Sequence, residues 1–280
     1  MKFMDVKAFA KINIGLNILS KRTDGYHDLS TLFYPIVDLY DTLHFEKADR
    51  FEFFCNSDFI PKDETNLVVK AKNFLQEFTH SNLNVKITLE KRIPSQAGLG
   101  GGSSDAAVTL NFLNEIFELG LDHQKLIDLA LKLGSDVPFF IDAKPSVGKS
   151  RGEILTQINL KIEEPILIVN PLIKISTKEA FQNISCDNTE IDFSVLINNG
   201  KLDYERLREN AKNDFENYVF NKYREIDSLK TILYDNGALF SLLSGSGSTV
   251  YGIFPNLDSA VNASQRVPAE YFVFISNPRG

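Results

Sequence analysis

Four of the five residues from 98 to 102 are glycines, and two serines, Ser103 and Ser104, follow them. Glycine lets the backbone adopt positive φ and come close to a ligand. The apolar pattern after the loop indicates a helix, whose start offers unpaired N–H groups and a partial positive charge. Such N–H groups, together with serine hydroxyls, can surround phosphate oxygens. The segment therefore predicts a phosphate-binding loop, and the alternative is an ordinary flexible loop with a serine helix cap.

Two common phosphate-binding patterns do not fit this loop. No Gly-Lys-Ser/Thr sequence ends it, which excludes the Walker A pattern. The dinucleotide fingerprint G-x-G-x-x-G needs a third glycine at the position of Ser103, and the preceding strand does not open a βαβ unit.

The elements around the loop follow from hydrophobic periodicity. Strict alternation predicts a half-buried strand from Val6 to Ile18, with Lys11 and Asn13 side by side on the face away from the core. A lone lysine on a strand is usually a solvated charge. Further helices are expected at 66–78, 106–117, 126–133 and within 204–236, and further strands at 85–89, 165–170, 249–254 and 271–275.

This mixture of strands and helices predicts an α+β fold in two lobes, 1–163 and 164–280. The segment Gly134–Phe140 contains Asp136 two residues before a proline. From spacing alone, Asp136 is expected to be the N-cap of a short helix that has the proline in its first turn.

Composition excludes several classes of function. Lys and Arg number 30 and Asp and Glu 37, a net charge of −7 without a basic cluster, which argues against nucleic acid or an anionic membrane as the main partner. Cys55 and Cys186 form no CxxC pattern and are expected to be free thiols. Polar residues interrupt the N-terminal apolar stretch, and no run of eighteen apolar residues occurs. We therefore expect a soluble, cytoplasmic protein, whose oligomeric state the sequence does not indicate.

Three segments together resemble the motifs of the GHMP kinases, in the same order. They are 8–13 (AFAKIN), 94–107 (PSQAGLGGGSSDAA) and 243–250 (LSGSGSTV), the last containing a second glycine turn. The resemblance implies a ribosomal-S5-like N-terminal lobe, a ferredoxin-like C-terminal lobe that binds the substrate, and ATP as cofactor. It assigns ATP contacts to Asn66, Gln96, Ala97, Gly98, Leu99, Gly100, Gly101, Gly102, Ser103 and Ser104. Gln96 departs from the family, where a small residue is usual.

The same resemblance gives the acid–base residues their roles. It implies that Asp136 is the catalytic base, paired with Lys11, which keeps it ionised and contacts the substrate oxygen. It also implies substrate contacts for Asn13, Gly245 and Ser246. ATP brings Mg²⁺, which takes oxygen ligands; Ser103 can face it, but the sequence identifies no protein carboxylate as a metal ligand.

The substrate is indicated by Arg22-Thr23-Asp24-Gly25-Tyr26-His27, which resembles the R-x-D-G-Y-H segment of 4-diphosphocytidyl-2-C-methylerythritol kinases. In that subfamily the tyrosine stacks on cytosine and the histidine reads its edge, which implies these roles for Tyr26 and His27. Phe181, four residues after Thr177, matches the aromatic residue on the other side of the base. The resemblance therefore implies that Thr177 and Phe181 both bind the substrate. The alternative is that Tyr26 and Phe181 are packing residues and His27 a surface histidine.

The implied activity is phosphorylation of a hydroxyl of the cytidine-diphosphate-linked methylerythritol, in the non-mevalonate isoprenoid precursor pathway. Two alternatives stay open: a GHMP kinase for homoserine, mevalonate or a similar alcohol, and a catalytically silent binding protein of this fold. The segment 213–216 (NDFE) also matches a family pattern, without an assigned role.

Overall fold

The computed structural model describes residues 4–184, 186 and 189–278, and it divides into two compact units that interleave along the chain. Unit 1 comprises Met1–Ala10, Leu39–Ser95 and Gly100–Ala143, and unit 2 comprises Lys11–Asp38, Gln96–Leu99 and Lys144–Gly280. Strands β1 (Met4–Lys21) and β2 (His27–Lys47) pair with each other, and each contributes residues to both units. The division into lobes at residues 163 and 164 stays a prediction.

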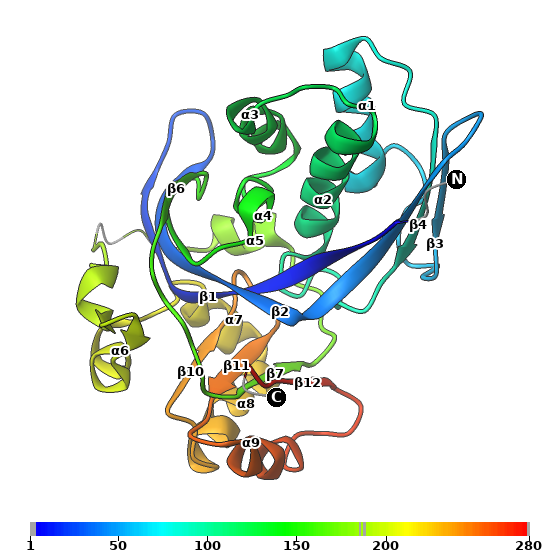
Figure 1. Cartoon of the computed structure of the whole chain (residues 1–280). Coiled ribbons are helices and arrows are strands. Elements are labelled where there is room, and N and C mark those ends of the chain that lie inside the picture. Colours follow the sequence, from blue (N-terminus) through cyan, green and yellow to red (C-terminus); the bar gives the residue numbers. More distant parts are fainter. Residues whose placement is uncertain (1–3, 185, 187–188, 279–280) are drawn as a thin grey trace. The chain divides into compact units, whose positions relative to one another are not determined.

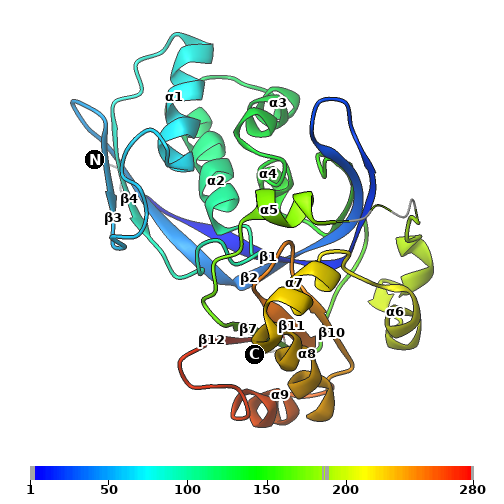
Figure 2. The ribbon, with the colours of Figure 1, turned by 180° about the vertical axis from the view of Figure 1, so that it is seen from behind.

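Unit 1 combines a sheet with a group of helices. Strand β3 (Glu52–Cys55) runs parallel to β4 (Val85–Glu90), and β4 pairs antiparallel with residues 42–47 of β2. Its helices are α1 (Leu67–Thr79), α2 (Gly101–Ile116), α3 (His123–Leu133) and α4 (Phe139–Asp142). Helices α1, α2 and α3 pack against one another, as Figures 1 and 2 show. The rings of Phe45 on β2 and Phe112 on α2 lie 4.5 Å apart, which joins helix and sheet in one core.

The periodic apolar residues predicted these elements correctly. Val85, Ile87 and Leu89 alternate on β4 and are all buried. Asn66 and Asp122 cap α1 and α3 with their side chains, and Gly134 ends α3 as expected from the sequence.

The described residues of unit 2 contribute to a six-stranded sheet and form a four-stranded sheet. In the six-stranded sheet, β5 (Ser146–Ser150) pairs antiparallel with residues 29–33 of β2 and with β6 (Ile154–Gln157). The remaining short elements are α5 (Thr177–Gln182), a 3₁₀ turn (Phe193–Leu196), β8 (Ile197–Asn198), β9 (Lys201–Leu202), α6 (Tyr204–Asn210) and α7 (Glu216–Lys222). The expected helical region from 204 to 236 is therefore three helices, the third being α8 (Arg224–Asp235).

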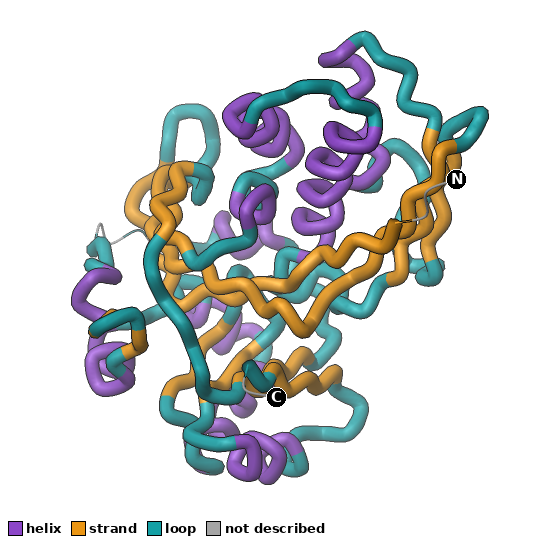
Figure 3. Tube along the Cα trace, in the orientation of Figure 1, coloured by secondary structure: helices purple, strands orange, loops and turns teal. Residues whose placement is uncertain are grey.

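The four-stranded sheet of unit 2 has the strand order β10-β11-β7-β12, with every pair antiparallel. Its strands are β7 (Ile166–Asn170), β10 (Phe240–Leu243), β11 (Val250–Ile253) and β12 (Phe272–Ser276). Helix α8 packs on β10 and β11, and α9 (Leu257–Ser264) packs on β7 and β12 (Figure 3). The chain order strand–helix–strand–strand–helix–strand in this arrangement is ferredoxin-like. The expected α+β class and the ferredoxin-like C-terminal sheet are confirmed.

One expectation about β1 is wrong. Lys11 and Asn13 do not project from a solvent-facing side, because only 2% of Lys11 and 1% of Asn13 is exposed. Period-two alternation distinguishes two faces of a strand, but it does not show whether the polar face is covered. Here residues of unit 2 cover it. Among the described residues, no helix is long and apolar enough to cross a lipid bilayer.

Candidate active site

The ammonium group of Lys11 lies in a buried cluster of unit 2. It donates hydrogen bonds to Asn13 Oδ1 at 2.6 Å and to the carbonyl oxygen of Gly98 at 3.0 Å. Asn13 Nδ2 in turn donates to Thr31 Oγ1 at 2.8 Å, and the hydroxyl of Thr31 donates to the carbonyl oxygen of Gly15 at 2.7 Å. The lysine tip therefore has a defined position on β1, although such a residue on a strand is usually mobile in water.

The segment 244–248, here called the glycine turn, covers this cluster within unit 2. Ser244 Oγ donates to the Gly98 carbonyl at 2.9 Å and accepts a hydrogen bond from the Asn13 N–H at 3.3 Å. The hydroxyl of Tyr251 donates to the Asn13 carbonyl at 3.0 Å. Residues of the first and third family motifs, and the start of the second, thus meet around Lys11.

Glycine is required where the two glycine segments touch. Gly98 has φ +76°, and a Cβ atom there would lie 2.0 Å from the carbonyl oxygen of Ser244. Gly245 has φ +56°, and a Cβ atom on it would lie 3.4 Å from Lys11 Nζ. A side chain at position 98 therefore cannot be accommodated without moving backbone.

The predicted phosphate loop ends in a helix start that lacks a side-chain cap. Gly100, the N-cap of α2, has left-handed φ +72°, and no side chain makes a cap hydrogen bond, so the serine-cap alternative is wrong. The first intrahelical bond runs from the Ser104 N–H to the Gly100 carbonyl at 2.9 Å. The amides of residues 101–103 precede that bond, as in helix starts that bind anions. Gln96, which departs from the family, is exposed and has φ +55°.

Asn66 and Asp136, both in unit 1, have different local roles. Asn66 is the N-cap of α1: its Oδ1 accepts from the Val68 N–H at 2.8 Å, and its Nδ2 donates to the Pro61 carbonyl at 2.7 Å. Asp136 lies in the turn before α4, whose N-cap is Pro138 without a side-chain hydrogen bond. The N-cap interpretation of Asp136 is therefore wrong. Its pairing with Lys11 of unit 2 stays a prediction, as does the contact of Asn66 with adenine.

Of the aromatic residues predicted to hold the substrate base, His27 and Phe181 are in direct contact in unit 2. The rings of His27 and Phe181 stack with centroids 4.9 Å apart and planes inclined by 20°. Tyr26 is 49% exposed, and the guanidinium of Arg151 lies 3.6 Å from its ring centroid. Burial lowers the pKa of His27, and nearby Lys21 lowers it further. The imidazole is thus neutral at pH 7 and offers one donor and one acceptor.

Thr177 and Ser246, two further predicted substrate contacts, are neighbours. Their hydroxyl oxygens are 3.0 Å apart, which connects the first residue of α5 with the glycine turn.

A buried charge cluster in unit 1 was not predicted from the sequence. Lys91, directly after β4, forms ion pairs with Asp41 of β2 and with Asp105 Oδ2 in α2, the latter at 2.9 Å. Asp41 Oδ1 also accepts from the backbone N–H groups of Arg92 and Ile93, at 2.6 Å and 2.9 Å. The cluster therefore ties the first turns of α2 to two strands. A residue pattern would not have revealed it, because its members are far apart in the chain.

The cluster holds two carboxyl groups and one ammonium group. Burial raises the pKa of Asp105 to about 7, and neighbouring Asp41 raises it while Lys91 lowers it. Burial opposes the charge of Lys91, yet the two carboxyl groups hold its pKa above the ordinary lysine value. Among the described residues, Asp105 Oδ1 is a buried oxygen without a hydrogen-bond partner.

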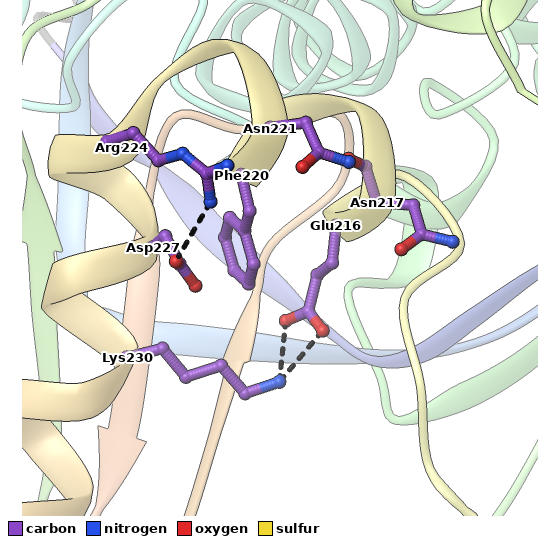
Figure 4. A pocket seen from close by; sticks show the side chains of 7 residues that line it. All are labelled: Glu216, Asn217, Phe220, Asn221, Arg224, Asp227 and Lys230. Carbon is purple, nitrogen blue, oxygen red and sulfur yellow. Dashed lines mark hydrogen bonds and ion pairs between the residues drawn. The ribbon is translucent and has the colours of Figure 1, made fainter.

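A surface pocket of unit 2 is separate from the predicted site residues. Its lining, shown in Figure 4, consists of Glu216, Asn217, Phe220, Asn221, Arg224, Asp227 and Lys230. Four of its charged groups pair with each other, Glu216 with Lys230 at 2.8 Å and Arg224 with Asp227 at 3.8 Å. No residue predicted to bind ATP or substrate lines it.

Comparison with known proteins agrees with the motifs. A model of the GHMP kinases N terminal domain matches residues 66–144, and a model of the GHMP kinases C terminal domain matches residues 196–273. The 4-diphosphocytidyl-2-C-methyl-D-erythritol kinase of Chlorobium chlorochromatii is 40% identical over 99% of this chain and 97% of its own length. The kinase of the same name from Chlorobium limicola is 43% identical over 93% of this chain and 91% of its own length.

Solved structures show the same relationship. A 4-(cytidine 5'-diphospho)-2C-methyl-D-erythritol kinase is similar with a TM-score of 0.82 and 30% identity, covering 97% of this chain and 98% of the other. A homoserine kinase from Cytophaga hutchinsonii has a TM-score of 0.74 at 16% identity, covering 99% of this chain and 95% of the other. The second similarity concerns the fold alone.

The contact between the glycine segments predicts a large effect of Gly98→Ala. Gly237→Ala is a matched control in unit 2, because Gly237 has φ +92° and nothing lies within 4 Å of its Cβ position. Left-handed strain alone should reduce the free energy of unfolding by about 1–2 kcal/mol in both variants. The free energy of unfolding should fall clearly further in Gly98→Ala than in Gly237→Ala, because the Cβ at position 98 also overlaps the carbonyl oxygen of Ser244. Urea unfolding of both variants measures the difference, and equal losses would contradict the crowding at position 98.

The raised pKa of Asp105 predicts a pH-dependent effect of Asp105→Asn. The ordinary aspartate pKa is 3.8 and the folded value is about 7, so between these pH values only the folded chain holds the proton. Stability of the native chain therefore decreases as pH rises through this window, and asparagine removes that decrease. Relative to the native chain, Asp105→Asn should be more stabilising at pH 8 than at pH 5 in urea unfolding.

Asp58→Asn is the control for this experiment, because the Asp58 side chain is 99% exposed. Its effect on the free energy of unfolding should change little between the two pH values. A pH-independent effect of Asp105→Asn would show that Asp105 is ionised throughout.

Proposed function

The chain belongs to the 4-diphosphocytidyl-2-C-methyl-D-erythritol kinase family of the GHMP kinases, and we propose that it phosphorylates a hydroxyl of the substrate named there, with ATP as donor. The observation that carries the proposal is the 40% identity over 99% of the chain to a kinase with that name. The reaction would serve the non-mevalonate route to isoprenoid precursors. Homoserine and mevalonate kinases share the fold at 16% identity or less, which supports no substrate assignment.

Phosphoryl transfer needs an oxygen nucleophile in line with the γ-phosphorus and stabilisation of the negative charge on the transferred group. Lys11 suits the second task because its ammonium is held between Asn13 Oδ1 and the Gly98 carbonyl, both fixed by further hydrogen bonds. A preorganised charge in a site that excludes water is more effective than one in solution.

The loop 96–104 is proposed to bind the ATP phosphates. The left-handed glycines at 98 and 100 and the amides before the first bond of α2 support this role. Mg²⁺ is proposed to arrive with the ATP phosphates, and Ser103, which is half-buried, carries a hydroxyl oxygen of the kind that Mg²⁺ accepts as a ligand. The described residues contain no group of three or more His, Cys, Asp or Glu arranged to hold a metal ion. Bound to phosphates, the metal would neutralise part of their charge.

Asp136 is proposed to orient the substrate hydroxyl and to take its proton. A carboxylate within hydrogen-bonding distance of the hydroxyl can do both. Asp136 lies in the turn directly before α4, and the N-cap of that helix is Pro138. Lys11 and Asn13 are proposed to contact the same substrate oxygen, together with Gly245 and Ser246.

The cytosine base is proposed to bind between Tyr26 and Phe181, with His27 reading its edge and Thr177 nearby. A base between two rings needs roughly 7 Å between them, twice an ordinary carbon–carbon contact of about 3.5 Å. The His27–Phe181 separation of 4.9 Å is that of direct stacking, so the base does not fit between these two rings. Binding on the Tyr26 side would require Arg151 to leave the Tyr26 face.

Asp136→Asn tests the assignment of the base. We expect kcat to fall by about 10²–10⁴-fold, because proton transfer to the base is lost, while ATP affinity changes little. Single-turnover kinetics and an ATP binding titration measure the two quantities separately. Asp142→Asn, a change of the nearby α4 carboxylate that pairs with His123, should leave kcat unchanged. A near-normal kcat in Asp136→Asn would show that Asp136 is not the catalytic base.

Phosphorus NMR tests the substrate. The protein with MgATP and 4-diphosphocytidyl-2-C-methyl-D-erythritol should give ADP and a new phosphomonoester, whereas homoserine, mevalonate and galactose should give none. Turnover of one of those alcohols instead would support the kinase activity and contradict the proposed cytidine pocket. Absence of any product, with ATP still bound, would favour a binding protein.

A further inference from the structure

The segment Asn213–Glu216, which matches a family pattern without an assigned role, is fixed to β1 within unit 2. The carbonyl oxygen of Lys212 accepts from the Leu16 N–H at 2.8 Å, and the Asp214 N–H donates to the Leu16 carbonyl at 2.9 Å. Asp214 Oδ2 also accepts from the Ile18 N–H at 2.7 Å. The segment is thus held, by backbone and side chain, to the strand that carries the buried lysine.

Asn213 connects this segment to the glycine turn. It is 2% exposed, and its Nδ2 donates to the carbonyl oxygens of Leu243 and Gly245, both at 2.8 Å. Its Oδ1 accepts from the Phe215 N–H at 3.0 Å. Both amide donors and the amide acceptor are therefore used, which only asparagine at this position can achieve with the same geometry.

Glu216 also binds the end of β10, at Leu243. Its Oε1 accepts from the Leu243 N–H at 3.1 Å, and Lys230 Nζ donates to Oε1 at 2.9 Å and to Oε2 at 2.8 Å. Figure 4 shows the two carboxylate oxygens of Glu216 turned toward Lys230. The N–H and the C=O of Leu243, the residue before the glycine turn, are therefore both bonded to side chains of this segment.

The glycine turn lies between this segment and Lys11 and contacts both. A Cβ on Gly245 would lie 3.4 Å from Lys11 Nζ. Ser244 donates to the Gly98 carbonyl, and that oxygen also accepts from Lys11. A shift of the turn would therefore displace an atom that the Lys11 ammonium depends on.

The segment also reaches the ring pair. Phe215 is 2% exposed and meets Phe181 edge to face, with ring centroids 4.9 Å apart. Phe181 in turn stacks on His27. One short stretch of chain thus contacts both the turn beside the lysine and the rings proposed for the substrate base.

We propose that Asn213 and Glu216 are positioning residues, which hold the glycine turn in the place that Lys11 requires to stabilise the negative charge during phosphoryl transfer. They act through the turn and touch neither substrate nor ATP. The proposal rests on the proposed kinase reaction for its kinetic test, but it makes a structural prediction that needs no activity.

Asn213→Asp is the first test, because it keeps the shape of the side chain and places a carboxylate oxygen against two carbonyls. Displacement of catalytic groups by about 1 Å reduces rate by about 10²-fold, so kcat should fall by about that factor. ATP affinity, measured by titration, should change less than threefold. Asn236→Asp is the matched control, since Asn236 Nδ2 donates to the Ile232 carbonyl of α8 at 2.8 Å, and it should keep normal kcat.

Amide hydrogen exchange gives the readout that is independent of activity. Exchange of residues 244–248 should accelerate by about tenfold or more in Asn213→Asp, as expected from the loss of a hydrogen bond, and should be unchanged in Asn236→Asp. If the native chain phosphorylates none of the tested alcohols, the proposed function fails, and the exchange data still decide whether Asn213 holds the turn.

Glu216 supplies a second pair of variants in case Asn213→Asp does not fold. Glu216→Gln keeps an oxygen that accepts from the Leu243 N–H and should retain kcat within threefold, with lower stability. Glu216→Leu removes that acceptor and should lose kcat to the same extent as Asn213→Asp. Equal kcat for both Glu216 variants, or folded Asn213→Asp with native kcat and native exchange, would overturn the proposal.

Discussion

An ammonium group that leaves water needs oxygen atoms close to it, and this requirement organises the centre of unit 2. Lys11 is 2% exposed, and its ammonium donates hydrogen bonds to Asn13 Oδ1 and to the Gly98 carbonyl. The Gly98 oxygen is available because residue 98 is left-handed and carries no Cβ. Ser244 donates to the same oxygen, so the glycine turn and the lysine share one acceptor. Gly98 thus provides an acceptor for Lys11, in addition to its proposed role in phosphate binding.

Those parts of the fold that depend on neighbours in sequence could be predicted. Strand β4 and helices α1, α2 and α3 follow from apolar periodicity, because each presents one apolar face to a core. The ends of α1 and α3 at Asn66 and Gly134 follow from capping chemistry, which needs only one or two residues. The ferredoxin-like order of the four-stranded sheet was implied by the family resemblance, since periodicity does not specify strand order.

The parts that depend on distant residues could not be predicted from local pattern. Lys11 and Gly98 are 87 positions apart, and Asn13 and Ser244 are 231 positions apart, so nothing near Lys11 indicates that its side of β1 is covered. Asp41, Lys91 and Asp105 are ordinary surface residue types, and only their meeting in unit 1 makes them a buried cluster. The roles of Lys11 and Asp136 came from motif resemblance, because a lysine on a strand and an aspartate in a turn are individually uninformative.

The Asp41–Lys91–Asp105 cluster also constrains how this sequence can change over generations. A chain that loses Lys91 first must fold with two acidic groups enclosed near each other, and burying unpaired charge is strongly destabilising. A chain that first exchanges Asp105 for a neutral residue retains Asp41 and Lys91 as an ion pair. These two residues can then be replaced in later substitutions. The order of substitution therefore matters at these three positions, and we expect them to vary as a group among relatives, with the lysine the last to be replaced.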